Sequence, residues 1–132
     1  MGRYSLSAAL GAALLLAAAA SPARADMLNL ECSDTRQGNE DYALTYWVDL
    51  EKQTITYANV YKGEVDLNTV ETLPVEITTG AFNFKMSVAG SPSNVTINRI
   101  NGVSTWYTPA LKIQTQTFVC RKGAQPYPAG KF

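Results

Sequence analysis

The sequence predicts an all-β fold: a small antiparallel up-and-down meander of about seven or eight short strands closed into a barrel, with a β-sandwich as the alternative. Three observations favour it. Apolar and polar side chains alternate from Tyr42 to Tyr61, and an Asn101-Gly102 turn lies between two runs rich in β-branched residues. Cys32 and Cys120 lie near the two ends of the mature chain, where closure of a meander would bring them together.

The N-terminus has the features of a secretory signal peptide. Residues 8–20 form an unbroken run of Ala, Leu and Gly, and Ala23-Arg24-Ala25 is a small-residue cleavage site. The apolar run is too short to cross a bilayer as a helix. We therefore expect a periplasmic or secreted protein without a membrane anchor. Its expected parts are a signal peptide (1–25), a single β-barrel domain (26–122) and a flexible C-terminal tail (123–132).

The first predicted strand is Leu28–Cys32, in which the apolar residues Leu28, Leu30 and Cys32 share one face. The polar run that follows, residues 33–41, contains a glycine and predicts a loop. It is also the longest acidic surface segment before the first hairpin.

The stretch from Tyr42 to Tyr61 predicts a hairpin with one apolar face on both strands. A two-residue turn at Glu51-Lys52 keeps this face apolar, but neither residue tolerates positive φ well. We therefore prefer a four-residue loop. That loop pairs Leu50 with Ile55, Val48 with Tyr57 and Leu44 with Tyr61.

Two more hairpins follow residues 65–70, which predict either a short edge strand or an irregular crossing. In the second hairpin Ile77 should lie opposite Phe82, and Val75 opposite Phe84. In the third, Asn101-Gly102 predicts a type I′ turn, because both central positions of that turn need positive φ. Its expected pairs are Ile100 with Val103 and Ile97 with Trp106, with Trp106 on the core face and Tyr107 outward.

The last predicted strand is Leu111–Arg121, and its apolar residues fall on both parities. Leu111, Ile113 and Val119 share one parity, whereas Phe118 and Cys120 share the other. A β-bulge between Ile113 and Phe118 would let both sets face inward.

The cysteine count and the charge pattern limit which classes of protein are possible. An even pair of cysteines in an exported protein predicts a disulfide, Cys32–Cys120. From Asp26 to Glu76 the chain has 11 acidic and 3 basic residues, and from Ile77 to Phe132 it has 6 basic residues and no Asp or Glu. The fold should therefore carry an acidic side and a basic side, unless the asymmetry is drift in a solvated surface.

Many enzyme classes are excluded by composition. The chain has no histidine, so it has no Ser-His-Asp or Cys-His pair and no histidine-based metal site. It also has no G-x-S-x-G motif, no phosphate-binding glycine loop and no calcium loop. We expect no enzyme activity, no metal and no cofactor, and no nucleic acid as a partner.

Three features could bind a partner. Trp47 has outward parity, and it is either an anchor for a partner or covered by residues 33–41 or 62–70. The acidic loop could face a basic partner or be solvated. The barrel interior, with the bulky side chains of Tyr46, Tyr57, Phe82, Phe84 and Trp106, could hold a ligand or be filled. The candidate binding residues are Trp47, Asp34, Glu40, Asp41, Tyr61 and Tyr107.

The layout resembles the periplasmic inhibitors of c-type lysozyme. Leu28–Cys32 and the closing run Thr117-Phe118-Val119-Cys120-Arg121 carry the resemblance. It implies an exported small barrel with paired first-strand and last-strand cysteines. Those inhibitors place a Ser-Gly motif and an aromatic residue in the enzyme; the sequence lacks this motif, since Thr79-Gly80 and Lys62-Gly63 have a different context. No inhibitory residue is therefore assigned by the resemblance.

The expected function is that of a monomeric exported binding module. Its partner would be a protein or an envelope polymer met through loops at one end of the barrel, such as a cationic enzyme of the lysozyme kind. The alternatives are a carrier for a small apolar ligand and a purely structural envelope protein.

Overall fold

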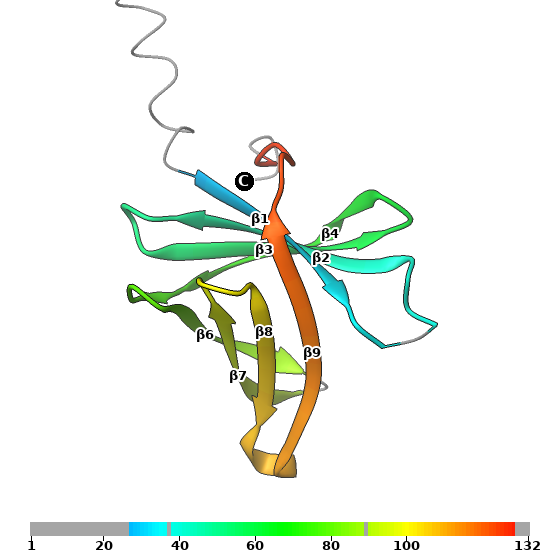
Figure 1. Ribbon diagram of the computed structural model, residues 1–132, viewed down its shortest axis with the longest axis vertical. Coiled ribbons are helices and arrows are strands. Elements are labelled where there is room, and N and C mark those ends of the chain that lie inside the picture. Colours follow the sequence, from blue (N-terminus) through cyan, green and yellow to red (C-terminus); the bar gives the residue numbers. More distant parts are fainter. Residues whose placement is uncertain (1–26, 37, 89, 129–132) are drawn as a thin grey trace, which may run out of the picture.

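The computed structural model describes residues 27–36, 38–88 and 90–128, so the predicted signal peptide lies outside the described part. These residues form one antiparallel sheet of nine strands with the order β4-β3-β2-β1-β9-β8-β7-β6-β5 (Figure 1). Within them the one helical piece is a 3-10 turn, η1 (Pro109–Leu111). The strands are β1 (Met27–Asp34), β2 (Tyr42–Asp49), β3 (Thr54–Tyr61), β4 (Glu64–Pro74), β5 (Glu76–Ile77), β6 (Ala81–Val88), β7 (Ser91–Asn98), β8 (Val103–Thr108) and β9 (Ile113–Lys122).

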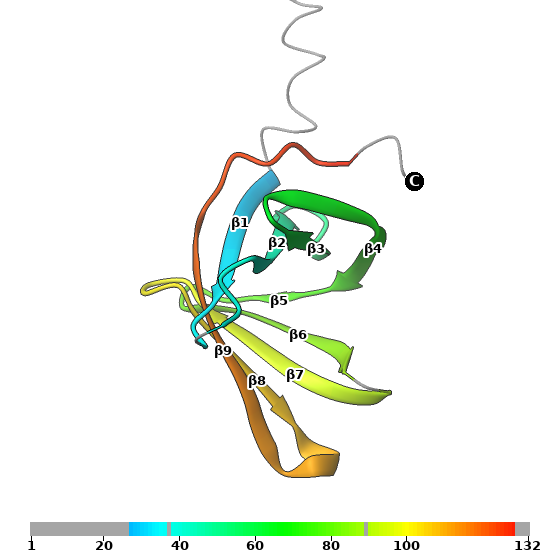
Figure 2. The same cartoon turned by 90° about the vertical axis from the view of Figure 1, so that its right-hand side faces the viewer.

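The all-β meander and its disulfide are confirmed. The sheet curls into a half-barrel, and β1 pairs with β9 so that Cys32 lies opposite Cys120 (Figures 1 and 2). The two residues form a disulfide with an S–S distance of 2.02 Å. The single sheet rules out the sandwich alternative. The first and last strands therefore lie side by side, as the cysteine positions predicted.

The ring of strands is open at a place that the sequence did not indicate. The sheet ends at β4 and β5, which are consecutive in the chain but not hydrogen-bonded to each other. β5 pairs with β6 over only two positions. The residue just before β5, Val75, donates its amide hydrogen to the carbonyl of Gln53 in the turn between β2 and β3. The predicted stretch 65–70 is part of the edge strand β4, and a register shift opposite Tyr57 and Asn59 interrupts its pairing with β3. An interrupted, charged edge resists pairing with other chains.

The preferred register of the first hairpin is wrong by two residues, because Val48 was expected opposite Tyr57. Val48 lies opposite Ile55, as a two-residue turn at Glu51-Lys52 would place it, and the last pair is Asp49 with Thr54. The reason is the side chain of Asp49, whose Oδ1 accepts hydrogen bonds from the amides of Glu51 (3.1 Å) and Lys52 (2.9 Å). This Asx turn fixes the loop one residue earlier than hydrophobic pairing suggests, and leaves Leu50 42% exposed.

The third hairpin is shifted for the same kind of reason. Trp106 lies opposite Val95 rather than Ile97. Oδ1 of Asn98 accepts hydrogen bonds from the amides of Ile100 (2.8 Å) and Asn101 (3.1 Å), so the turn begins at Asn98. Gly102 has φ +79°, but Asn101 does not have positive φ, and the turn is therefore not type I′. The predicted facing directions hold: Trp106 is buried, and Tyr107 is 45% exposed.

The second hairpin and the last strand agree better with expectation. Ile77 lies opposite Phe82 as predicted, although Val75, which is buried, falls outside the ladder. The register between β8 and β9 shifts at Trp106/Tyr107, which confirms a bulge between Ile113 and Phe118.

The bulge does not turn both apolar sets of the last strand inward. Phe118 and Cys120 are buried, whereas Leu111 (53%) and Val119 (47%) are exposed. The side chain of Ile113 lies outside the part that the structure describes. The predicted strand also begins too early, since Leu111 belongs to η1.

The concave face of the sheet is filled by aromatic side chains. Tyr46 packs edge-on against Phe84 with ring centroids 5.5 Å apart, and Trp106 stacks on Phe118 at 5.6 Å. Phe82 belongs to the same buried cluster, and Tyr57 is half-buried against it. The side chains predicted to line the interior therefore pack against one another.

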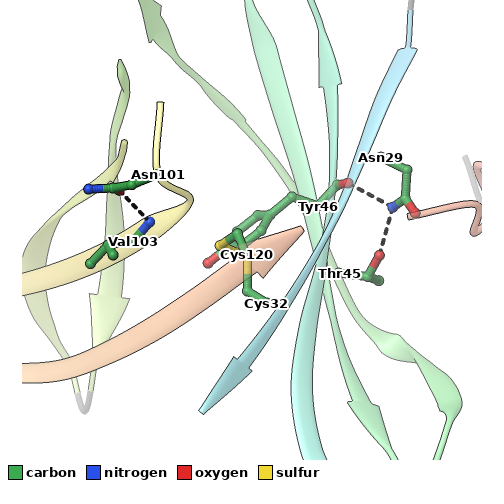
Figure 3. The surroundings of a disulfide bond; sticks show 7 residues. All are labelled: Asn29, Cys32, Thr45, Tyr46, Asn101, Val103 and Cys120. Atoms are coloured by element: carbon green, nitrogen blue, oxygen red, sulfur yellow. Dashed lines mark hydrogen bonds between the residues drawn. A yellow bond between two sulfur atoms is a disulfide. The ribbon is translucent and has the colours of Figure 1, made fainter. Parts of the chain in front are cut away.

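The outer face of β2 is also covered, by residues 123–128, which we call the tail segment. The amide of Gly123 donates to the carbonyl of Asn29 (2.9 Å), and the amide of Gln125 donates to Oδ1 of Asn29 (2.8 Å). A side chain on Gly123 would collide with Asn29. Asn29 in turn donates to Thr45 Oγ1 (2.8 Å) and to the carbonyl of Tyr46 (2.9 Å), as Figure 3 shows beside the disulfide. This part of the predicted flexible tail is therefore packed on the sheet.

Candidate functional site

Two connections meet at one end of the β1–β4 half. The loop that leads from β1 to β2 and the turn from β3 to β4 lie together on the right-hand side of Figure 1. The amide of Lys62 donates to the carbonyl of Asp41 (2.8 Å), and the amide of Tyr42 donates to the carbonyl of Asn39 (3.0 Å). These bonds hold the acidic loop against the start of β4. We call this region the acidic end.

Asp34 organises the loop rather than facing a partner. Its side chain is fully buried, and Oδ2 lies 2.7 Å from Arg36 Nη2. Oδ1 accepts the amide of Arg36 at 2.9 Å, and Asn39 Nδ2 donates to Oδ2 at 3.2 Å. The hydrogen bonds from the Arg36 side chain lower the pKa of Asp34 below its usual value, against the opposing effect of burial. The structure therefore corrects the expectation of an exposed carboxylate at this position.

Beside the loop lies a polar groove of about 550 Å³ on the outer face of the sheet. We call it the acidic groove, because its lining contains three carboxylates and only two cations. The amides of Glu40 itself and of Gly38 donate to the Glu40 side chain and lower its pKa, so this exposed group is ionised at neutral pH. The polar lining consists of Glu31, Ser33, Glu40, Asp41, Thr45, Lys62, Arg121 and Gln125.

Tyr61 projects from the rim of the acidic end. It is 59% exposed, and Lys62 Nζ lies 5.5 Å from the centre of its ring. A tyrosine face attracts cations, so the same ring could accept a cationic side chain from a partner. Glu64, the residue opposite Tyr61 on β4, and Asp66 are exposed and add negative charge beyond the groove.

The six candidate residues do not form one cluster. Four of them, Asp34, Glu40, Asp41 and Tyr61, lie at the acidic end. Tyr107 is outward and exposed as predicted, but it belongs to β8 in the other half, next to η1.

Trp47 has the predicted outward parity, but it is only 2% exposed. Its Nε1 donates to the carbonyl of Gln125 (2.9 Å), and the ring of Tyr127 packs edge-on against it at 5.9 Å. Trp47 is therefore covered, which is one of the two expected alternatives. The hydrogen bond and the ring contact come from the tail segment, and Val65 and Leu67 of the predicted 62–70 cover line the same hollow.

Several residues of the acidic groove are not among the binding residues predicted from the sequence. Glu31 and Ser33 flank Cys32 with outward parity, and Arg121 follows Cys120; their place beside the disulfide pair was the available signal. Arg121 Nη2 lies 3.4 Å from Glu31 Oε2, across the β1–β9 pair. The contribution of Gln125 had no signal in the sequence, because it depends on where the tail segment packs.

The described residues contain no group of three or more Cys, Asp or Glu side chains that could hold a metal ion. Nor does this part of the chain include a helix long and apolar enough to span a membrane. No protein-family model, curated protein or solved structure matches the chain significantly.

Proposed function

We propose that the protein is a small exported binding module, without catalytic activity, that recognises a cationic protein through its acidic end. One observation carries the proposal: Glu40 and Asp41 share a groove with Glu31, and the exposed Tyr61 lies in the chain between Val60 and Lys62, which also line this groove. A lysine or arginine side chain of the partner would enter the groove between the carboxylates. Exposed charges of this kind mainly accelerate and orient association.

The disulfide supports an oxidising compartment such as the periplasm. Among cationic proteins met there, a c-type lysozyme is the partner that the resemblance in strand and cysteine layout implies. The filled concave face gives no support to a carrier for an apolar ligand.

The test is a binding experiment with the oxidised protein immobilised. Envelope extract, and separately a c-type lysozyme, are passed over it at low and high salt. We expect a partner whose binding weakens as salt rises, because screening at about 0.1 M already acts over about 10 Å. The double variant Glu40→Gln/Asp41→Asn should weaken binding about tenfold, which corresponds to about 1.4 kcal/mol.

The matched control is Glu51→Gln/Glu76→Gln, which removes two exposed carboxylates outside the acidic groove. It should leave affinity within about twofold, since distant exposed charges are screened. Equal losses in both double variants would show a general charge effect and reject the site. Failure to capture any salt-sensitive partner would reject the proposed function.

A further inference from the structure

A second groove, of about 410 Å³, lies where the turn between β7 and β8 meets the end of β9. We call it the basic groove. The carbonyl of Gly102 accepts the amide of Cys120 (2.7 Å), and the amide of Arg99 donates to the carbonyl of Gly80 (2.9 Å), so the turn is held on both sides. A side chain at Gly102 would collide with the carbonyl of Cys120. The groove is thus a built feature of the fold.

Its charge is positive. Arg99, Arg121 and Lys122 line it, and no carboxylate does so among the residues that the structure describes. Glu31 lies at the border, 3.4 Å from Arg121. Arg99 donates to the carbonyl of Thr78 (2.6 Å), and its guanidinium stands 4.7 Å from the centre of the Phe82 ring, which keeps this cation at the groove wall.

Next to these cations the groove is apolar. Leu28 and Leu30 of β1 line it, together with Phe82 and Ile97 from the core. Ile100 stands at the tip of the turn and is 86% exposed, more than any other large apolar residue described. A ligand that carries both an anionic group and hydrocarbon fits this groove best, because the cations attract the anion and the hydrocarbon removes Ile100 from water.

We propose that the basic groove docks on the surface of a phospholipid membrane that carries anionic headgroups. The lipid phosphate lies against Lys122 and Arg121, and Ile100 enters the boundary between headgroups and acyl chains. Charge complementarity favours this occupant over a neutral surface. The exposed apolar tip favours it over a free phosphate ion, which would leave Ile100 in water. This inference does not depend on the proposed function.

The test is flotation of the full, oxidised protein with phosphatidylglycerol-containing vesicles and with pure phosphatidylcholine vesicles. We expect partition onto the anionic vesicles only. Ile100→Ser and, separately, Lys122→Glu should each reduce it about tenfold. Arg121 stays unchanged, because it also lines the acidic groove. The matched controls are Leu111→Ser and Lys112→Gln at the tip beside η1, where an exposed apolar residue also adjoins a cation.

The proposal is supported if both groove variants lose binding while both control variants keep it and all melt like the parent protein. Absence of binding to anionic vesicles would overturn it, as would equal losses in the control variants. An unchanged Ile100→Ser variant would overturn the proposed docking too, because the binding would then be unspecific charge attraction. Complete displacement by millimolar inorganic phosphate would show a site for the free anion instead.

Discussion

The two halves of the sheet bury their strands in different ways. In the β5–β9 half, alternate residues of β7 and β8 are buried, because only the concave face is covered. In the β1–β4 half, every residue of β2 from Leu44 to Asp49 is buried. There the tail segment forms a further layer over the outer face. Alternation in sequence thus predicts alternation in burial only where the other face of a strand stays in water.

Charge separates the halves as well. The β1–β4 half carries the acidic end and its groove, and the β5–β9 half carries Arg99, Lys112 and Lys85. The two grooves meet at Arg121, which lines both. The uneven distribution of charge along the sequence therefore becomes an acidic and a basic surface, which lie on either side of the β1–β9 pair.

The largest expected effect comes from breaking the covalent link between the halves. Cys32→Ser/Cys120→Ser removes a disulfide that spans 88 residues of sequence. The free energy of unfolding should fall by about 4 kcal/mol, because the unfolded chain regains the entropy of an open loop. Urea unfolding of the double variant and of oxidised and reduced parent protein measures this. A loss below about 1 kcal/mol would show that strand pairing alone joins the halves.

A smaller effect should follow from removing the outer layer. A chain ending at Lys122 loses the carbonyl that accepts from Trp47 Nε1 and the amide that donates to Asn29 Oδ1, so Trp47 enters water. We expect a loss of about 2 kcal/mol, the order for exposing a large apolar side chain. In a Trp106→Phe background, the remaining tryptophan emission should shift to the red and become open to acrylamide quenching.

Leu111→Ser is the control for that truncation, since it changes an exposed apolar residue in the other half. It should leave the emission of Trp47 unchanged. A truncated chain with blue-shifted, unquenched emission would mean that another part of the molecule covers Trp47.

How far the sequence could predict this molecule differs between the strands and the turns. Strand positions, the inward Trp106 and the cysteine pair followed from periodicity and spacing. Two hairpin registers did not, because the side chains of Asp49 and Asn98 bind the backbone of the turn. Hydrophobic pairing is unchanged by a shift of two residues, so it could not decide between the registers.

The site was less predictable than the fold. The sequence shows the acidic loop, but the pairing of Asp34 with Arg36 depends on the conformation of that loop, and closeness in the chain alone does not predict it. The cover on Trp47 comes from Gln125 and Tyr127, 78 residues or more away, and no periodic pattern marks such a contact. A non-periodic segment that packs on a sheet has no signature in local sequence.

The smallest expected effect tests whether the acidic end is organised by charge. Asp34→Asn should cost about 1–2 kcal/mol at neutral pH, because the ion pair with Arg36 is lost while Arg36 stays half exposed. The pKa of Asp34 is lower in the folded protein than in the unfolded chain. Its stabilisation is therefore present above the unfolded value, about 3.9, and is lost as pH falls through the lower folded value.

The difference in unfolding free energy between the parent protein and Asp34→Asn should accordingly shrink in acid and vanish below the folded pKa. Thermal or urea unfolding across that range measures it, with Glu51→Gln, an exposed carboxylate of the same half, as the control that should change little. A difference that stays constant with pH would assign the cost to lost hydrogen-bond geometry. The loop would then be shaped by the bonds that Asp34 accepts and not by its charge, and the ionic contrast between the halves would be confined to the exposed residues Glu40 and Asp41.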